Sequence, residues 1–265
     1  MRADRVLALG AECGKISRKF PTWTHLLLNR GAAHGGEHCF LGSLLSMRTA
    51  FSLTYVTYDD EDPLGWVLAL ITLTPIFVMV MYATLIVFRR DVHTLALLAG
   101  QLLNEATSVS LKAIVSASKW RHYAVRPPGG DKVGSGMPSS HTQFMFFFTT
   151  YSALFIFRRV TLEKPAAKPV IAMGLETLSF LVGYSRCHLL YHTEEQVIVG
   201  AVLGAVLGAL WYGVVQTFLV PHFAAAQDWG FLRTFHFKDT THVPFLHRFE
   251  RLCASRVAAS EKRCH

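Results

Sequence analysis

Long apolar runs alternate with short polar loops along this chain from residue 63 onward. The clearest run extends from Leu64 to Phe88, 25 residues without a charge (LGWVLALITLTPIFVMVMYATLIVF). At about 1.5 Å per residue, a helix of this length crosses the roughly 30 Å of hydrocarbon in a bilayer. Pro75 inside the run is compatible with a membrane helix, because neighbouring groups can satisfy the carbonyl that it frees.

Four further runs predict helices of similar length. They extend over about Thr94 to Val115, Pro138 to Phe157, Pro169 to Tyr184 and Val197 to Val220. The first of these contains polar side chains, which we expect to face a bundle interior because charge at mid-bilayer costs a few kcal/mol. They are Gln101, Asn104, Glu105 and Lys112. The five spans together predict an all-α, polytopic membrane helical bundle.

Other patterns concern packing and the N-terminal part of the chain. Gly200, Gly204 and Gly208 repeat every four residues, a spacing that lets helices approach closely, and we expect packing within the bundle ahead of homodimerisation. The run from Phe144 to Phe148 predicts either a lipid-contacting patch near a functional site or ordinary bilayer-facing aromatics. The segment from Cys39 to Tyr58 is only partly apolar and contains Arg48, so it predicts at most an interfacial helix.

Composition agrees with a membrane protein. Of the 265 residues, 51% are hydrophobic and only 17% are charged, and the mean hydropathy is +0.31. Soluble domains carry roughly 25% charged residues. We expect an N-terminal region of unclear role over 1–62, a membrane-embedded functional domain over 63–221, and a basic cytoplasmic tail over 222–265.

Positive charge is unevenly distributed along the chain. The 26 Lys and Arg exceed the 18 Asp and Glu by 8, and no motif suggests nucleic-acid binding. The basic loops at 89–90 and 158–168 share one side of the membrane with the tail, which predicts that this side is cytoplasmic. The acidic stretch 59–62 and the loops 116–137 and 185–195 then lie opposite, and the positive charges of these two loops indicate an anion site.

Cysteine and histidine spacing predicts neither a metal site nor a disulfide framework. The five cysteines contain no CxxC pair and are odd in number. The stretch from His34 to His38 matches the zinc-peptidase pattern H-x-x-E-H, which needs both histidines on one helical face. Gly35 and Gly36 each cost about 1 kcal/mol in a helix, so we predict no metal here and no cofactor elsewhere.

Three short segments on the predicted non-cytoplasmic side contain groups suited to phosphoryl transfer. They are Lys119-x6-Arg126-Pro127, Pro138-Ser139-Ser140-His141 and Ser185-Arg186-x5-His192. The reaction requires cations on the phosphate oxygens, an in-line nucleophile and an acid for the leaving oxygen. Lys119, Arg126 and Arg186 can supply the cations, and the helix that follows Pro138 offers an anion its free N–H groups.

Two histidines complete this set. One can attack phosphorus and form a phosphohistidine, and the other can protonate the departing oxygen. Each group alone has an ordinary structural explanation, since Lys and Arg anchor helix ends and Ser caps helices. Because the three segments stand at the ends of successive spans on one face, their combination favours a metal-free covalent phosphatase.

These motifs, in this order, resemble the signature of the type-2 phosphatidate phosphatase superfamily, which also includes bacterial acid phosphatases and vanadium haloperoxidases. Three longer stretches are similar to its dolichyl-diphosphatase branch: LNEATSVSLK from Leu103, GMPSSHTQFMFFF from Gly136 and YSRCHLLYHTEEQV from Tyr184. The resemblance covers the chain from about Leu64 to the tail and leaves out the first 50 residues.

The resemblance implies a role for each motif residue. His192 corresponds to the nucleophile and His141 to the general acid. The phosphate-binding set comprises Lys119, Arg126, Ser139, Ser140 and Arg186. The implied reaction is metal-independent hydrolysis of dolichyl diphosphate to dolichyl phosphate on the luminal face of the endoplasmic reticulum, which serves dolichol recycling for protein N-glycosylation. The implied side agrees with the loop charges.

Three positions depart from the general superfamily pattern, and the first, Ser140 in place of Gly, is shared with the dolichyl branch and supports that branch. Superfamily members often place Asp four residues after the nucleophile, where this chain has Gln196, which could accept the Nδ1 proton of His192 and leave Nε2 free. The lysine of the dolichyl branch corresponds to Lys112, fourteen residues before Arg126 rather than about seven, whereas Lys119 has the expected spacing. Since seven residues are nearly two helical turns, both lysines could share one face, and the sequence leaves both open.

Two alternative functions stay open on the sequence. An unchanged phosphate clamp would also serve phosphatidate, a sphingoid phosphate or another polyprenyl diphosphate, since selectivity lies in the bundle surface. The lysine spacing and Gln196 also allow a catalytically inactive membrane homologue.

Overall fold

The structure is a computed structural model of the whole chain, and it describes residues 48–51, 56–59, 61–128, 135–162, 164–240 and 250–256. Contacts divide the chain into two compact units, Met1–Ser46 and Met47–His265. All described residues belong to the second unit. The H-x-x-E-H stretch from His34 to His38 lies outside the described residues.

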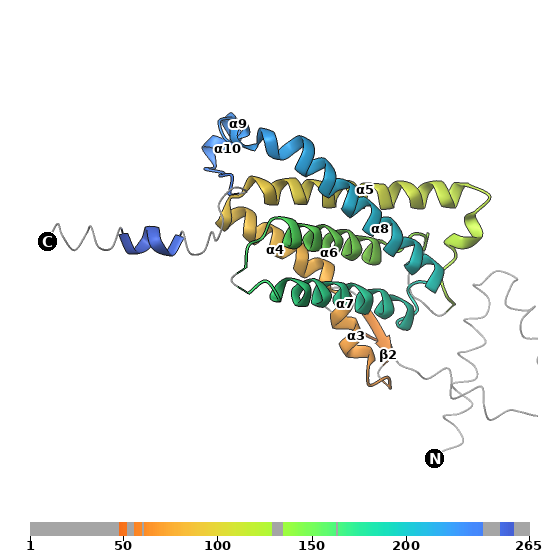
Figure 1. The fold of residues 1–265 in the computed structure, drawn as a ribbon. Coiled ribbons are helices and arrows are strands. Elements are labelled where there is room, and N and C mark those ends of the chain that lie inside the picture. The colour runs from red at the N-terminus through yellow and green to blue at the C-terminus, as the bar shows by residue number, and fades with distance from the viewer. Residues whose placement is uncertain are drawn as a thin grey trace, which may run out of the picture. The chain divides into compact units, whose positions relative to one another are not determined.

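Helices occupy all five predicted spans (Figure 1). They are α3 (Gly65–Thr72) with α4 (Thr74–Arg89), α5 (Val92–Ala117), α6 (Ser140–Arg158), α7 (Ala167–His188), and α8 (Glu194–Val214) with its continuation through η4 (Val215–Leu219) and η5 (Val220–His222). The short helices η3 (Arg121–Ala124), α9 (Phe223–Ala226) and α10 (Gly230–Thr234) lie in the connections and the tail. The helical prediction is confirmed, with one important shift. Because α7 extends four residues beyond its predicted end at Tyr184, Ser185 and Arg186 lie in its last turn rather than in the following loop.

The first predicted span is interrupted in its middle. Leu73 ends α3 and precedes α4, and Pro75 occupies the second position of α4, where its missing N–H costs no helical hydrogen bond. The Thr74 hydroxyl donates to Ile71 O at 2.6 Å and helps to satisfy the end of α3. Thr72, the last residue of α3 before the break, is buried in the bundle.

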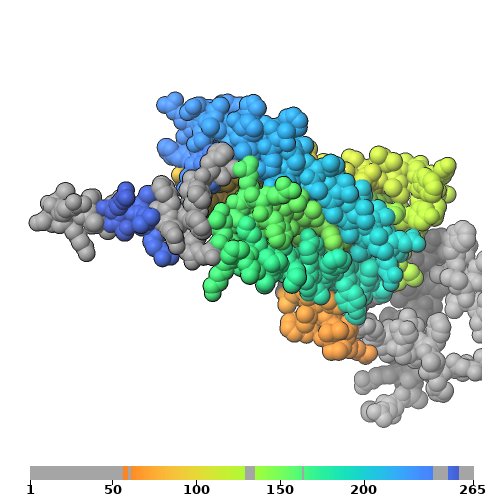
Figure 2. All heavy atoms as spheres, viewed as in Figure 1, coloured from red at the N-terminus to blue at the C-terminus, as the bar shows by residue number. Residues whose placement is uncertain are grey.

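The segment before α3 forms a hairpin rather than an interfacial helix, so that prediction is wrong. Within the described residues of this region, β1 (Arg48–Phe51) pairs antiparallel with β2 (Val56–Asp59). The strand sequences RTAF and VTYD contain β-branched and aromatic residues, which fit a pleated surface better than a helix. Helix α3 lies against α7 and β2 packs on α3, and Figure 2 shows the orange residues of this region beside the bundle.

Helix α6 lies in the middle of the bundle and contacts α4, α5, α7 and α8. The side chains from Phe144 to Phe148 are therefore all buried, and neither predicted lipid-facing arrangement is correct. On the α8 side, the three regularly spaced glycines face the α6 backbone. A Cβ on Gly204 would lie 2.3 Å from Gln143 O, and similar clashes occur at Gly200 and Gly208. Packing within the bundle, the favoured explanation of these glycines, is confirmed.

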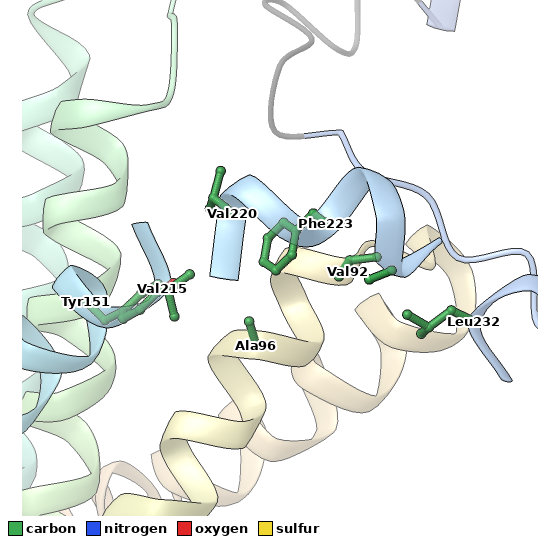
Figure 3. Packing of buried hydrophobic residues seen from close by; sticks show 8 residues of the cluster. Val92, Ala96, Tyr151, Val215, Val220, Phe223 and Leu232 are labelled. Carbon is green, nitrogen blue, oxygen red and sulfur yellow. The ribbon is translucent and has the colours of Figure 1, made fainter. Parts of the chain in front are cut away.

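At one end of the bundle, a hydrophobic cluster joins the start of α5 to the C-terminal tail (Figure 3). Its buried residues are Val92, Ala96, Tyr151, Val215, Val220, Phe223, Ala226 and Leu232. Backbone hydrogen bonds add a bridge in which Val92 N donates to Lys238 O and Lys238 N to Arg90 O. The basic loop at 89–90 and the tail thus share one end of the bundle, as predicted.

Within the described ranges, two helical segments are long and apolar enough to cross a membrane, Gly65–Arg89 and Glu194–Ala226. Large apolar side chains are exposed along both segments, including Phe77, Val80, Val202 and Leu210. Exposed apolar surface of this extent is typical of helices that contact lipid.

Candidate active site

His192 lies in the tight turn between α7 and α8. The N–H groups of Tyr191 and His192 both donate to Arg186 O, each at 3.0 Å, and the turn is made possible by Leu190 in the left-handed region at φ 57°. Helix α8 then begins with a capping box between Thr193 and Gln196. As a result, His192 is only 3% exposed, and its position is fixed by the turn that precedes it and by the helix start that follows it.

Gln196 fixes the tautomer of His192. The Gln196 Nε2 group donates to Tyr123 O at 2.8 Å and to Val125 O at 2.7 Å, so its amide oxygen must point the other way. That Oε1 lies 3.0 Å from His192 Nδ1, which must therefore carry the proton and donate it. Nε2 then carries the lone pair, as Gln196 in place of Asp was expected to allow, and in this structure it faces Arg126 Nη1 at 3.4 Å.

The loop before α6 packs directly on this amide. A Cβ on Gly136 would lie 2.4 Å from Gln196 Oε1, so only glycine leaves room for the side chain. Gly136 N donates to Ala124 O at 2.7 Å, and Ser139 N donates to Gln196 O at 3.1 Å. The second motif and the start of α8 are thereby held together.

Arg126 reaches His192 from the η3 side. Its Nη1 donates to Tyr191 O at 2.7 Å and lies 3.4 Å from His192 Nε2, and its Nη2 donates to Ser135 O at 3.1 Å. Both guanidinium ends are thus fixed by backbone carbonyls of other segments. A phosphate attached to Nε2 would form directly beside this cation.

Arg186 is the second cation and is almost fully buried, with 2% of its surface exposed. Its Nη1 donates to Thr72 Oγ1 at 2.9 Å, and its guanidinium carbon lies 3.9 Å from the centre of the Tyr191 ring. Its Nε has no hydrogen-bond partner among the described residues. A buried charged donor without an acceptor is costly, which points to an anionic ligand at this position.

Lys112 and Lys119, the two lysines that the sequence offers for the phosphate clamp, have different surroundings in the structure. Lys112 Nζ donates to Ser140 Oγ, which also accepts a hydrogen bond from Ser108 at 3.2 Å, and the Lys112 charge acts on His192. Lys119 is exposed, and its Nζ lies 5.5 Å from the centre of the Trp120 ring. Both lysines were candidates, and Lys112 is the one that the structure brings to the second motif.

The remaining residues of the second motif occupy the start of α6. Ser139 is the N-cap, but its hydroxyl is fully buried and lies 3.0 Å from Thr142 Oγ1 rather than on a backbone N–H. Ser140 and His141 are the first two residues of the helix and are half-buried. The N–H groups of this first helical turn lie next to the Lys112 contact, where the helix dipole favours an anion.

Cations dominate the electrostatics at His192. Burial, together with Arg186 and Arg126, lowers the pKa of His192 to about 3, although the Gln196 hydrogen bond acts in the opposite direction. The imidazole is therefore neutral at physiological pH and can act as a nucleophile. The same positive charges would attract a phosphate and stabilise negative charge developing on its oxygens.

Some residues of the site were missed by the sequence reasoning. Tyr191 contacts both arginines, Thr72 contacts Arg186, and Ser108 contacts Ser140. Ser108 could have been found, because it precedes Lys112 by one helical turn. Tyr191 and Thr72 carry no such signal, because their contacts depend on the turn after α7 and on the break after α3.

A hydrogen bond between His188 and Asp62 ties the acidic stretch to the same end of the bundle. His188 Nε2 lies 2.6 Å from Asp62 Oδ2, and this contact lowers the pKa of Asp62. The acidic stretch therefore shares its side with the His192 turn, as the loop charges predicted.

Comparisons with known proteins agree with this geometry. The family model of the PAP2 superfamily matches residues 93–219, which include Lys112, Arg126, His141 and His192. The chain is 37% identical to Dolichyldiphosphatase 1 of Mus musculus over 222 residues, covering 80% of this chain and 90% of the relative. It is 36% identical to Dolichyldiphosphatase 1 of Dictyostelium discoideum over 207 residues, covering 76% and 87%.

A solved structure shares the fold. The crystal structure of a transmembrane PAP2 type phosphatidylglycerolphosphate phosphatase from Bacillus subtilis is similar with a TM-score of 0.50 and 21% identity, covering 60% of this chain and 80% of that one. The predicted all-α membrane bundle is thereby confirmed. This chain belongs to the PAP2 superfamily and, within it, to the dolichyldiphosphatase family.

Proposed function

We propose that this protein hydrolyses dolichyl diphosphate to dolichyl phosphate and phosphate through a phosphohistidine, and so serves dolichol recycling for protein N-glycosylation. The observation that carries the proposal is the arrangement around His192. Its Nδ1–H is committed to Gln196 at 3.0 Å, while its Nε2 faces Arg126 at 3.4 Å and is acted on by the charges of Arg186 and Lys112. Kinship with the dolichyldiphosphatases supports the choice of lipid.

In the first step, His192 Nε2 attacks the terminal phosphorus of the diphosphate. The bond between this phosphorus and the bridging oxygen breaks, and the electron pair goes to the bridging oxygen of dolichyl phosphate. His141, in its protonated form, donates a proton to that oxygen. The arginines, Lys112 and the N–H groups at the start of α6 hold the oxygens of the transferred group, with Ser140 beside Lys112.

In the second step, water attacks the phosphohistidine. His141 accepts a proton from this water, the P–N bond breaks, and its electron pair returns to Nε2, so the resting tautomer is restored. Throughout both steps, Gln196 Oε1 accepts the Nδ1 hydrogen and stabilises the positive ring that exists while phosphate is attached. Ser139 contributes through its backbone N–H, which holds the start of α6 to Gln196 O.

We place the protein in the endoplasmic reticulum membrane with its active site on the luminal face. The basic loop at 89–90 and the tail lie at one end of the bundle, whereas Asp62 and the His192 turn lie at the other. Positive loops favour the cytoplasm, which supports a luminal position for the site. A reporter fused after His265 is then expected in the cytoplasm, and glycosylation of a tag at that position would contradict the topology.

The decisive experiment measures phosphate release by the detergent-purified protein. Dolichyl diphosphate, phosphatidate and dolichyl monophosphate are compared in the presence of a chelator, with His192→Ala as the control. We expect preference for the diphosphate, unaffected by the chelator and abolished by the substitution. Release from phosphatidate instead would keep the mechanism and replace the substrate, and release from none of the lipids would favour an inactive homologue.

A further inference from the structure

Tyr191 touches both arginines of the site, although it is not one of the fixed residues of the three motifs. Its backbone carbonyl accepts the hydrogen bond from Arg126 Nη1 at 2.7 Å. Its ring covers the Arg186 guanidinium, whose carbon lies 3.9 Å from the ring centre. One residue therefore contacts two cations that come from different segments of the chain.

Tyr191 is held in turn by strand β2. The Thr57 N–H donates to the Tyr191 hydroxyl oxygen at 2.9 Å, and the Thr57 hydroxyl lies 3.1 Å from the same atom. The Tyr191 side chain is buried in a small cluster with Val56, Ala69 and Leu73. Its ring thus has a fixed position, set by the hairpin and by α3 rather than by α7 or α8.

Arg186 has a second support from the same part of the chain. Thr72, the last residue of α3, accepts a hydrogen bond from Arg186 Nη1 at 2.9 Å. Thr57 and Thr72 both precede residues 93–219, the part that matches the family model. The segment from β2 to α3 therefore supports the phosphate site from outside the matched region.

The turn after α7 reverses the chain and brings the Tyr191 ring over the Arg186 guanidinium. Leu190 adopts φ 57°, and the N–H groups of Tyr191 and His192 both point at Arg186 O. The ring and the guanidinium are then five residues apart in sequence but in direct contact. A cation over an aromatic face gains more when water is excluded, and both side chains are about 2% exposed.

We propose that Tyr191 is a positioning residue that sets the distance between Arg126 and Arg186 for a terminal phosphate group, and that Thr57 and Thr72 anchor this unit. The inference rests on the proposed function and adds to it the residue that joins the two arginines. Without the ring, Arg186 keeps its charge but loses the surface that fixes its plane. The phosphate clamp then weakens in the ground state and in the transition state alike.

The test compares Tyr191→Leu, Tyr191→Phe and Tyr151→Leu in the full chain purified in detergent. Tyr151 is a matched control, because it is also buried and hydrogen-bonded, 3.1 Å from His93 Nε2, but belongs to the opposite end of the bundle. KM and kcat for the lipid diphosphate, inhibition by orthovanadate and the thermal midpoint are measured for each variant.

For Tyr191→Leu, we expect KM and the vanadate inhibition constant to rise roughly tenfold to thirtyfold, as for loss of a desolvated cation–π contact. Tyr191→Phe keeps the ring over Arg186 but loses the hydrogen bond from Thr57, so both constants should rise less, by about threefold. Tyr151→Leu should lower the thermal midpoint but leave the vanadate constant within about twofold, since it lies outside the phosphate site. Equal vanadate constants for the two Leu variants would show that Tyr191 is only a structural residue.

Two further variants keep the outcomes distinct. If Tyr191→Leu does not fold, Thr72→Val removes the other support of Arg186 at nearly constant volume, and an unchanged vanadate constant would then overturn the proposal. If His192→Ala retains turnover, the proposed function fails. If His192→Ala is inactive while Tyr191→Leu behaves like the natural chain, the function stands and this inference is wrong.

Discussion

Two buried histidines lie near opposite ends of α5: His93 belongs to this helix, and His192 belongs to the turn before α8. Only His192 lies in a site that can perform chemistry. His93 is the second residue of α5, is 6% exposed, and contacts Tyr151 and the ring of Phe155 at 4.5 Å (Figure 3 shows Tyr151 in this cluster). His192 is about as deeply buried but lies near Lys112, which is nineteen residues, or about 28 Å, farther along the helix. Burial alone therefore does not identify a functional histidine.

The difference lies in the neighbours. Charges of both signs act on His93, from Arg159, Asp91 and Asp239. Among the described residues, the charges that act on His192 are those of Arg186, Arg126 and Lys112, all positive. His93 also has its Nδ1 buried without a partner in the described part of the chain, whereas His192 Nδ1 faces an oriented amide oxygen. Of the two, His192 thus combines an assigned proton with an excess of positive charge around its unprotonated nitrogen.

The largest effect that this comparison predicts is on the two histidines themselves. His192→Ala removes the proposed nucleophile and should reduce kcat by at least about 10³-fold. His93→Phe keeps an aromatic ring of similar shape in the hydrophobic cluster and should leave kcat within about threefold. Turnover of dolichyl diphosphate by both purified variants decides the matter, and a loss of activity in His93→Phe at unchanged thermal midpoint would break the comparison.

The next effect concerns the source of the positive charge. Lys112→Ala removes a cation that acts on His192 and should reduce kcat/KM about 10²-fold. Lys119→Ala removes only an exposed charge beside Trp120 and should stay within about twofold. Steady-state kinetics of the two variants side by side would assign the clamp lysine, and the reverse order of effects would transfer that role to Lys119.

A smaller effect is expected from replacing Gln196, whose amide oxygen accepts the Nδ1 proton of His192. Gln196→Ala leaves His192 free to adopt either tautomer and should lower kcat roughly 10- to 100-fold, the range seen when outer partners of metal-bound histidines are removed. KM should change less, because the cations remain. Gln101→Ala is the control, since Gln101 is an equally buried amide whose partners are Phe144 O and Tyr82. If both variants lose activity equally, loss of a buried hydrogen bond explains the result and the tautomer does not.

The smallest expected effect is that of pH on the protonation state of His192, which should not change. With a pKa near 3, His192 should stay neutral and protonated at Nδ1 from pH 8 to pH 5, whereas an ordinary histidine takes up a proton near pH 6.5. Nitrogen chemical shifts of ¹⁵N-histidine-labelled protein, with His192→Ala for assignment, measure this directly. Protonation of the His192 signal above pH 5 in the ligand-free protein would contradict the charge arrangement described above.

The same shift has a consequence for stability. The folded-state pKa of His192 lies below the unfolded value of about 6.5, so the unfolded chain binds more protons at acidic pH. The contribution of His192 to the free energy of unfolding therefore decreases as pH falls below about 6.5. Chemical unfolding at pH 7 and pH 5, compared between the natural chain and His192→Ala, would reveal it as a smaller pH dependence in the variant.

The sequence predicted the helices well because their signal is local. Uncharged runs of span length indicate which segments avoid water. The glycines every four residues from Gly200 to Gly208 indicate which face of a helix approaches its neighbour closely. The aromatic run from Phe144 to Phe148 was misplaced because apolar side chains look the same whether they face lipid or another helix. The break at Leu73 was missed for a related reason, since the sequence shows Pro75 but not whether the helix continues through it.

The site was only partly predictable from sequence. Motif order placed Arg126, Arg186, the histidines and Ser140 at one end of the bundle, and the structure brings them there, although their roles stay predictions. The lysine could not be chosen, because seven residues place Lys112 and Lys119 on similar helical faces, and only the end of α5 at Ala117 separates them. Tyr191, Thr57 and Thr72 depend on contacts between distant segments, which spacing along the chain does not encode.

Gln196 closes the capping box that starts α8, and the same oxygen that accepts the Thr193 N–H also accepts the proton of His192. The hydrogen bonds that begin α8 and the one that orients His192, the proposed nucleophile, therefore depend on the same side chain. Fraying of a single helical turn, which needs far less energy than global unfolding, is enough to release the imidazole. Heating should therefore abolish turnover reversibly at temperatures where most amide hydrogens of the bundle are still protected from exchange with solvent.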